Sequence, residues 1–229
     1  MSLLWTVPRP ERLVENIGNL EMRLFTEQAL HHFWVYLWMP STKGGGWHPR
    51  DEYRPGGNYL HVSRVLRVLE HLLRDDEGNE HNPWPKLTEE EQDIRRVAVI
   101  LHDINKITTK GRVSTGPNII MTEFSRQYGR GWAKAHPWAE TVVELVAVHG
   151  GAFYKDAEVN KRTIRYDPQN KLHRLVHLAD FIASRNDIMV DFEAPFGVRN
   201  RRSRTEQKAM MRVVKWLAQR NTLNESKEQ

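Results

Sequence analysis

The chain has 229 residues, of which 39% are hydrophobic and 28% are charged, and its formal net charge is +5. No run of roughly 18 uncharged apolar residues occurs, so the sequence predicts one or two globular domains and no membrane span. Cysteine is absent, which excludes disulfides, thiolate nucleophiles and zinc sites built on sulfur. Residues 1–12 lack the basic-then-apolar pattern of an export signal, and we therefore expect a cytoplasmic protein.

The first elements in chain order are expected to be helices. Residues 11–39 carry apolar side chains at helical spacing, interrupted by Gly18, and this pattern predicts one or two core helices. The following stretch, 40–58, is rich in glycine and proline and is expected to be a loop without regular structure. His61 then opens a segment whose apolar residues form one wide helical face.

The next helix has a clear start signal. Thr88 precedes three glutamates, and Glu91 stands at the capping-box position, so a helix is expected to begin here and to run to about Asn105. Its last turns are almost entirely apolar, which predicts deep burial around His102. Farther along, residues 118–124 are consistent with either a short helix or an irregular lid.

Two more helices complete the expected core. Pro137 follows His136, and proline is favoured at the first helical position, so a helix is expected from there to His149. The two glycines at 150–151 end it. The last core helix is expected over Lys171 to about Ile188. The elements together predict an all-α protein.

The expected organisation is one compact domain in three parts. Residues 1–57 form an N-terminal helical extension and a loop, residues 58–190 form the core, and residues 191–229 form a basic C-terminal helix and tail. Within it, residues 199–220 have eight basic residues and a single acidic one, Glu206. Such a run forms either a solvated helix face or a surface that contacts phosphates.

Five potential metal ligands lie on or beside apolar helix faces: His61, the adjacent pair His102 and Asp103, His149 and Asp180. A single buried histidine is usually a hydrogen-bonded core residue. The pair is different, because burying a carboxylate costs free energy unless a cation compensates its charge. Divalent ions such as Mn, Fe, Co, Ni, Zn or Mg accept imidazole and carboxylate ligands together. We therefore expect one or two such ions, with Asp103 able to bridge a pair.

The order of these residues resembles the HD superfamily of metal-dependent phosphohydrolases. The stretch 101–106, LHDINK, is similar to the LHDIGK stretch of many members, and residues 178–180, Leu-Ala-Asp, are similar to the helix that bears the family's last aspartate. The resemblance covers residues 58–182, just over half of the chain. It implies a helical bundle with the active site between helices.

The resemblance also implies roles for individual residues. One metal is held by His61, His102, Asp103 and Asp180, and Lys106 contacts the phosphate of the substrate. In members with two metals, further histidines bind the second ion, and His136 and His149 are similar to those positions. The sequence departs from the usual pattern here, because these two histidines are only 13 residues apart and glycine follows the second.

Three more residues are candidates for contact with substrate. His173 and His177 share a helix face with Asp180, since they precede it by seven and three residues. Either one is a candidate to support a ligand or to bind substrate. Arg185 follows little more than one turn after Asp180, and a cation there is either a surface charge or a group that neutralises charge on phosphoryl oxygens.

The function favoured by the sequence is hydrolysis of phosphodiester bonds in single-stranded nucleic acid. The net positive charge favours an anionic partner, and the ligand order resembles that of HD nucleases associated with CRISPR systems. Trp47, Trp132 and Trp138 are either core residues or platforms on which bases stack. Phosphate-binding glycine loops, the Gly-x-Ser-x-Gly elbow and the HEXXH spacing are absent.

Three alternatives stay open at this point. In the first, the enzyme is a nucleotide phosphohydrolase that acts on nucleoside phosphates, dinucleoside polyphosphates or cyclic dinucleotides. In the second, the domain is a nucleic-acid-binding module without activity, as part of a larger nucleoprotein assembly. The third alternative is an HD-type oxygenase that uses two irons.

Overall fold

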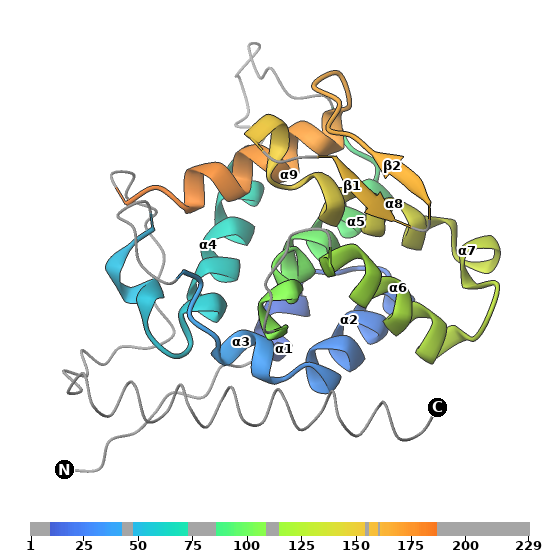
Figure 1. Ribbon diagram of the computed structural model, residues 1–229, viewed down its shortest axis with the longest axis horizontal. Helices are drawn as coiled ribbons and strands as arrows, with labels where there is room; N and C mark the ends of the chain where they lie inside the picture. Colours follow the sequence, from blue (N-terminus) through green and yellow to red (C-terminus); the bar gives the residue numbers. More distant parts are fainter. Residues whose placement is uncertain are drawn as a thin grey trace.

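The computed structural model describes residues 10–42, 48–72, 86–108, 115–153, 156–159 and 161–186. These residues form a helical bundle with one small hairpin at its edge (Figure 1). The expected basic helix over 191–229 lies outside the described residues, and so does Trp47. Within the described residues, none of the helices has both the length and the apolar character that a membrane span requires.

The helices and strands follow one another in this order: α1 (Pro10–Val14), α2 (Leu20–His32), α3 (Val35–Trp38), the 3-10 helix η1 (Arg50–Tyr53), α4 (Gly57–Leu72), α5 (Glu89–Leu101), η2 (Ile104–Ile107), α6 (Thr115–Tyr128), α7 (Trp132–Ala135), α8 (Pro137–Val148), η3 (Gly151–Phe153), β1 (Ala157–Val159), β2 (Arg162–Ile164) and α9 (Lys171–Ala183). The all-α class expected from the sequence is confirmed.

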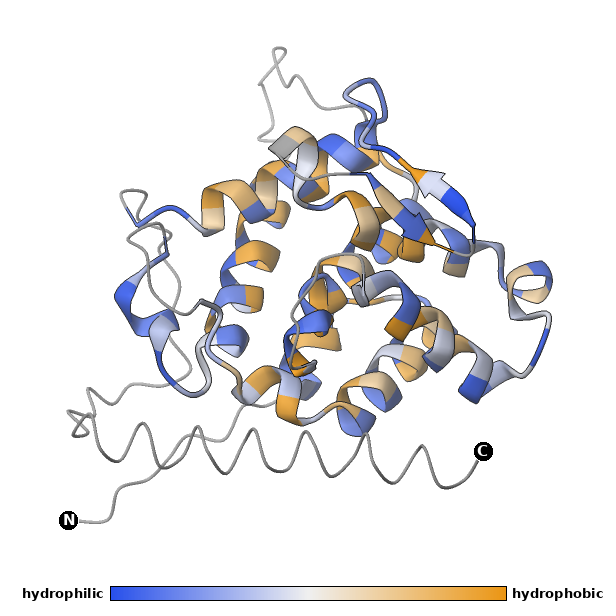
Figure 2. Ribbon diagram, viewed as in Figure 1, coloured by the Kyte–Doolittle hydropathy of each residue, from blue (hydrophilic) through white to orange (hydrophobic). Residues whose placement is uncertain are grey.

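Helices α5 and α8 lie at the centre of the bundle. They pack against each other, while α4 packs against α9 and α6 packs against α8. The sequence of α8 is apolar on nearly every side, so neighbours must cover it all round. Figure 2 shows hydrophobic residues concentrated in α8 and on the inward sides of the surrounding helices. The N-terminal helices α1 and α2 contribute to the same hydrophobic core as the rest.

The start of α5 is confirmed, but its end is earlier than expected. Thr88 accepts a hydrogen bond from the backbone N–H of Glu91, and the Glu91 side chain accepts one from the Thr88 backbone, which completes the capping box. The helix ends at Leu101, and the backbone then turns through His102 and Asp103 into η2. This turn, rather than a continuous helix to Asn105, places the His-Asp pair at a helix end.

The glycine- and proline-rich stretch before α4 holds more regular structure than expected. Residues 50–53 form η1, and α4 begins at Gly57 instead of near His61. N–H groups at the start of α4 have partners outside the helix: Gly56, just before α4, donates to the Trp38 carbonyl (2.9 Å), and Asn58 donates to the Met39 carbonyl (2.8 Å). These bonds satisfy backbone donors that a helix start leaves unpaired, and they fix the segment between α3 and α4.

Three further features differ from or refine the expectations. The stretch left open between a short helix and a lid is part of α6. The antiparallel hairpin of β1 and β2 was not expected from the sequence, and its turn holds Lys161 at a φ of 63°. Trp132 and Trp138 are core residues, since both pack on Phe124, which itself stacks on Phe25. Their burial removes them as base-stacking platforms.

Candidate metal centre

Four side chains from three regions of the chain meet between the central helices. His61 comes from α4, His102 and Asp103 come from the turn that follows α5, and Asp180 comes from α9. The convergence follows from packing, because α4 contacts both α5 and α9, and α5 also contacts α9. These four residues are called the metal cluster below. The structure thus brings together the residues singled out from the sequence.

The distances within the metal cluster suit a single ion. His61 Nε2 lies 3.2 Å from His102 Nε2 and 3.1 Å from Asp180 Oδ1. Asp103 Oδ2 lies 3.3 Å from His102 Nε2 and 3.8 Å from His61 Nε2. Donor atoms of His61, His102 and Asp180 all lie within 4.8 Å of one another, which is a separation that ligands of one ion can have.

The polar contacts of the two histidine rings show why a cation fits between them. His102 Nδ1 lies 2.6 Å from the Val99 carbonyl and His61 Nδ1 lies 3.3 Å from Glu52 Oε2. Carbonyl and carboxylate oxygens only accept, so in each neutral ring the proton belongs on Nδ1 and the lone pair on Nε2. Two lone pairs 3.2 Å apart do not form a hydrogen bond with each other. A cation between them supplies the positive charge that both nitrogens face.

Burial and charge shape the protonation of the metal cluster. His61 and His102 are 1% and 2% exposed, whereas the side chains of Asp103 and Asp180 are 15% and 19% exposed. Burial alone would lower the pKa of His61, but the contacts with Asp180 and Glu52 outweigh it and raise that pKa to about 9.

Both aspartates of the metal cluster are held in the charged form. Burial would raise the pKa of Asp180, but His61 and His102 outweigh it and lower that pKa. Burial would likewise raise the pKa of Asp103, but Lys106 and His102 outweigh it and hold the pKa well below its ordinary value. A cation that displaces the second proton of His61 would therefore meet two carboxylates and two imidazoles, the ligand types that divalent transition metals accept.

Lys106 borders the metal cluster. It lies on η2, one turn after the His-Asp pair, and its Nζ donates to Asp103 Oδ2. Nζ also donates to Ser41 Oγ and to Asn58 Oδ1, each at 3.3 Å. These partners hold the ammonium at the partly exposed edge of the cluster, where it is positioned to meet an anion that enters from solvent.

His149 lies against the metal cluster. It is the C-cap residue of α8, and its Nδ1 lies 2.7 Å from the Val146 carbonyl, so its lone pair is on Nε2. Its ring packs edge-on against the His102 ring, with centroids 5.1 Å apart. Burial and the neighbouring His102 lower the pKa of His149, which favours the neutral form that ligates a metal. Its role as a ligand stays a prediction.

The expectation for His136 is corrected by the structure. His136 and His149 stand at opposite ends of α8, and at 1.5 Å per residue they are separated by about 20 Å along its axis. His136 Nδ1 pairs with Glu21, and its ring packs on Tyr128 at 4.2 Å between centroids. The helix length thus keeps this residue away from the metal cluster, and a second ion cannot take ligands from both histidines.

The other candidates, two on α9 and one just after its end, have contacts outside the four residues of the metal cluster. His177 Nδ1 donates to the His149 carbonyl at 3.0 Å. Its ring lies so close to Gly151 that an added Cβ would be 2.4 Å from it. Arg185 places its guanidinium over the Phe181 ring, 5.8 Å from the centroid. His173 Nε2 pairs with Glu144 at 2.9 Å. Substrate contacts by His177 and Arg185 stay predictions.

Glu52 is a site residue that the sequence reasoning missed. It lies on η1 and is fully buried, with its carboxylate next to the Nδ1 atoms of His48 and His61. It was missed because it falls in the stretch expected to be an irregular loop, where no periodic pattern marks a buried side. The only available signal was a carboxylate four residues after a histidine, which is weak.

A model of the HD domain family matches residues 58–184, which is more than half of the chain. The chain belongs to the HD domain family. Neither the comparison with curated proteins nor the comparison with solved structures gave a match. HD domains are metal-dependent phosphohydrolases that bind divalent metals, and this general activity is assigned to the chain. The matched segment contains the whole metal cluster and Lys106.

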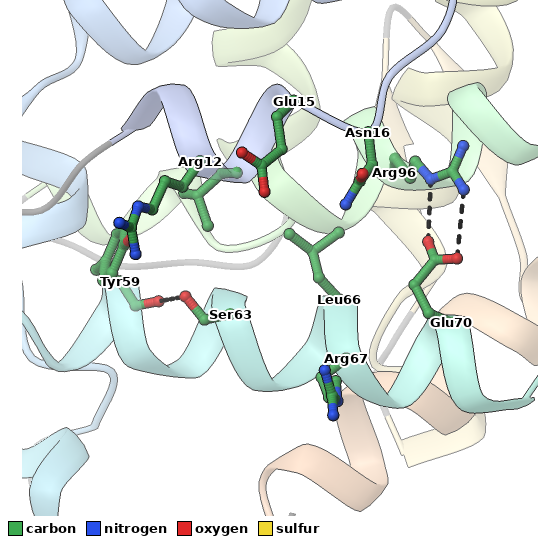
Figure 3. Close-up of a pocket in the computed structure, with 10 residues that line it drawn as sticks. Arg12, Glu15, Asn16, Tyr59, Ser63, Leu66, Arg67, Glu70 and Arg96 are labelled. Carbon is green, nitrogen blue, oxygen red and sulfur yellow. Dashed lines mark hydrogen bonds and ion pairs between the residues drawn. The ribbon is translucent and has the colours of Figure 1, made fainter. Parts of the chain in front are cut away.

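A separate hollow of about 530 Å³ lies on the other side of α4 of this HD domain. Figure 3 shows Tyr59, Ser63 and Glu70 of α4 facing Arg12 and Arg96 across it. Its lining residues on α4 are on the face opposite to the metal cluster, by their helical spacing. Glu70 accepts a 3.0 Å hydrogen bond from Arg96 Nε, so the charge of Arg96 is balanced locally. The hollow therefore adds nothing to the phosphohydrolase site.

Proposed function

We propose that this HD domain hydrolyses phosphodiester bonds in single-stranded nucleic acid. The observation that carries the proposal is the meeting of His61, His102, Asp103 and Asp180 beside Lys106. A divalent ion held there would polarise a phosphoryl oxygen and lower the pKa of water. The two histidines and Asp180 would hold the ion, with Asp103 as the second carboxylate.

The residues of the chain then position the substrate. The carboxylates are the more exposed side of the metal cluster, so a phosphate group would approach past them. Lys106, already on that side, would neutralise charge that develops on the phosphoryl oxygens. The excess of 34 Lys and Arg over 29 Asp and Glu supports a polyanionic substrate over a single nucleotide.

A nucleotide phosphohydrolase is the second candidate, because the metal cluster is recessed. The two histidines are almost fully buried, and the Lys106 side chain is only 21% exposed. A recessed site with one bordering lysine suits a terminal phosphate that enters end-on. A binding module without activity is less well supported, since the full ligand set is present and assembled.

The test combines metal removal with a substrate panel. Metal-stripped protein receives Mn, Co, Ni or Mg together with labelled single-stranded DNA, single-stranded RNA, double-stranded DNA or nucleotides. We expect metal-dependent cleavage of a single strand. Asp103→Ala should lower the rate at least about 100-fold, since several kcal/mol of transition-state stabilisation depend on the ion. Asp156→Ala removes an exposed aspartate on the hairpin side and is the matched control.

The outcomes separate the candidates. Cleavage of nucleotides without cleavage of single strands replaces the nuclease proposal by the second candidate. If no combination of substrate and metal gives turnover, and Asp103→Ala keeps its affinity for nucleic acid, the enzyme proposal is contradicted and the binding module is left.

A further inference from the structure

Glu52 is a buried carboxylate that contacts His61 on the side of the ring that faces away from the rest of the metal cluster. Its side chain has no exposed surface. Its Oε2 accepts a hydrogen bond from His48 Nδ1 at 2.8 Å and lies 3.3 Å from His61 Nδ1. The opposite nitrogen of the His61 ring, Nε2, is the one that faces His102 and Asp180. The imidazole therefore connects Glu52 directly to the metal-facing atoms.

We propose that Glu52 is the positioning residue of the metal centre. It holds His61 in the tautomer with the proton on Nδ1 and fixes the ring so that Nε2 points at the ion. Carboxylates that accept a hydrogen bond from a metal-binding histidine orient the ring and increase its basicity. The inference rests on the proposed function, because it concerns the same metal site.

In the described part of the chain, no hydrogen bond ties His61 Nδ1 to another group, although His48 Nδ1 shares Glu52 Oε2. At 3.3 Å the contact between Glu52 and His61 Nδ1 is looser than an aligned hydrogen bond. A buried N–H group without a partner is costly. A small rotation of the His61 ring toward Glu52 removes that cost and leaves Nε2 for the ion.

Glu52 is itself held firmly. Arg64, almost one turn after His61 on α4, donates to Glu52 Oε1, and it also donates to Asp51 Oδ2 at 2.6 Å. The Glu52 backbone carbonyl accepts a 3.0 Å hydrogen bond from Ser41 N–H. A Cβ on Gly57 would lie 2.0 Å from that same carbonyl oxygen, so the backbones are packed as closely as glycine allows. A carboxylate held in this way can restrict the ring that it contacts.

A second ion between His48, Glu52 and His61 is the competing interpretation. Donor atoms of these three residues lie within 4.8 Å of one another. However, Arg64 already balances the Glu52 charge. In addition, His61 would have to lose its Nδ1 proton to bind a second ion while Nε2 binds the first. The three residues therefore support the metal cluster better than they bind an ion of their own.

The test measures metal binding instead of activity. Glu52→Gln keeps the shape of the side chain and removes its charge, and the affinity of stripped protein for Co²⁺ is measured by its visible absorption. We expect affinity to fall about 10- to 100-fold with an altered spectrum. Glu123→Gln is the matched control: Glu123 is another buried glutamate that pairs with an arginine and a histidine, on α6. Its Co²⁺ affinity should stay within about twofold of wild type.

The results separate this inference from the proposed function. A wild-type protein that binds no metal contradicts the proposed function itself. Wild-type affinity and spectrum in a folded Glu52→Gln protein contradict only the role of Glu52. Loss of a second bound equivalent, with the first unchanged, also overturns the positioning role and supports a second ion.

If Glu52→Gln does not fold, a measurement on the unmodified protein tests the role of Glu52. Nitrogen-15 correlation spectra of the Zn²⁺-loaded wild type report which ring nitrogen of each histidine carries the proton. We expect His61 to carry it on Nδ1 and to bind through Nε2. A proton on Nε2 of His61 overturns the inference.

Discussion

At the scale of single residues, Lys106 is the cation best placed to act on a substrate. Its ammonium group lies at the exposed edge of the metal cluster and is held by Asp103, Ser41 and Asn58. Of these partners only Asp103 is charged, so a phosphate group that arrives finds a cation that is only partly neutralised. Replacement of this lysine should affect the reaction more than the binding of metal.

Lys106→Met should lower kcat on the preferred substrate about 10²- to 10³-fold, the size of effect seen when one charge-stabilising donor is removed. Steady-state kinetics at saturating metal measure it, with Co²⁺ affinity as the second readout. Affinity should fall less than tenfold, because Lys106 is not a ligand. Lys134→Met, which removes an exposed lysine on α7, is the control. An unchanged kcat would rule out the role of Lys106.

At the scale of elements, the close packing of η1 against the start of α4 sets the position of Glu52. Gly57 is required there, since a Cβ would come within 2.0 Å of a backbone oxygen that cannot move independently. The hydrogen bonds that join α3 to the start of α4 hold the same region. A side chain at position 57 must therefore displace η1 as a whole.

Gly57→Ala should lower the free energy of unfolding by about 1–3 kcal/mol, as expected for overpacking. It should also weaken Co²⁺ binding, because Glu52 moves with η1. Urea unfolding and metal titration measure the two effects. Gly18→Ala is the comparison, since a Cβ there meets Asp93 only at an ordinary 3.5 Å. Equal free energies of unfolding for the two variants would show that η1 can shift away from position 57 without loss of stability.

At the scale of the whole molecule, buried carboxylates make stability depend on pH. Glu123 illustrates the sign. Burial would raise its pKa, but hydrogen bonds from Arg126, Gln127 and His32 outweigh it and lower the pKa below 4.5. The folded state therefore binds this proton less readily than the unfolded state does. The contribution to stability is present above about pH 4.5 and is lost as the pH falls through the lowered pKa.

Glu123→Gln should reduce the free energy of unfolding by about 1–3 kcal/mol at pH 7, the cost of leaving buried donors without their charged partner. The difference from wild type should shrink below pH 4.5. Urea unfolding at several pH values between 3 and 7 measures it, and the comparison between variants removes the contributions of other acidic groups. A difference that stays constant down to pH 3 would contradict the assignment.

The sequence predicted the parts of this molecule that regular patterns encode. Thr88 with Glu91 located a helix start, and the apolar run before His102 indicated that the His-Asp pair is buried. It was wrong about His136, because that assignment followed the order of the histidines in the family, whereas the helix expected from Pro137 to His149 already places the two histidines about 20 Å apart. It missed Glu52 because contacts between a loop and a distant helix leave no periodic signal in either segment.

The hairpin was missed for a related reason. Its strands, β1 and β2, have three residues each and include charged positions such as Glu158 and Arg162. So short a segment gives almost no alternation to detect. The general activity followed from the order of the candidate ligands, whereas the substrate depends on surfaces that no motif marks.

The spread of the metal cluster along the chain also has a consequence for biosynthesis. Three of its members, His61, His102 and Asp103, are translated before Asp180, which is made only with α9. A growing polypeptide that ends before this helix lacks one of the two acidic donors. The complete set of four donors, and with it the full affinity for an ion, is therefore expected only in the completed bundle.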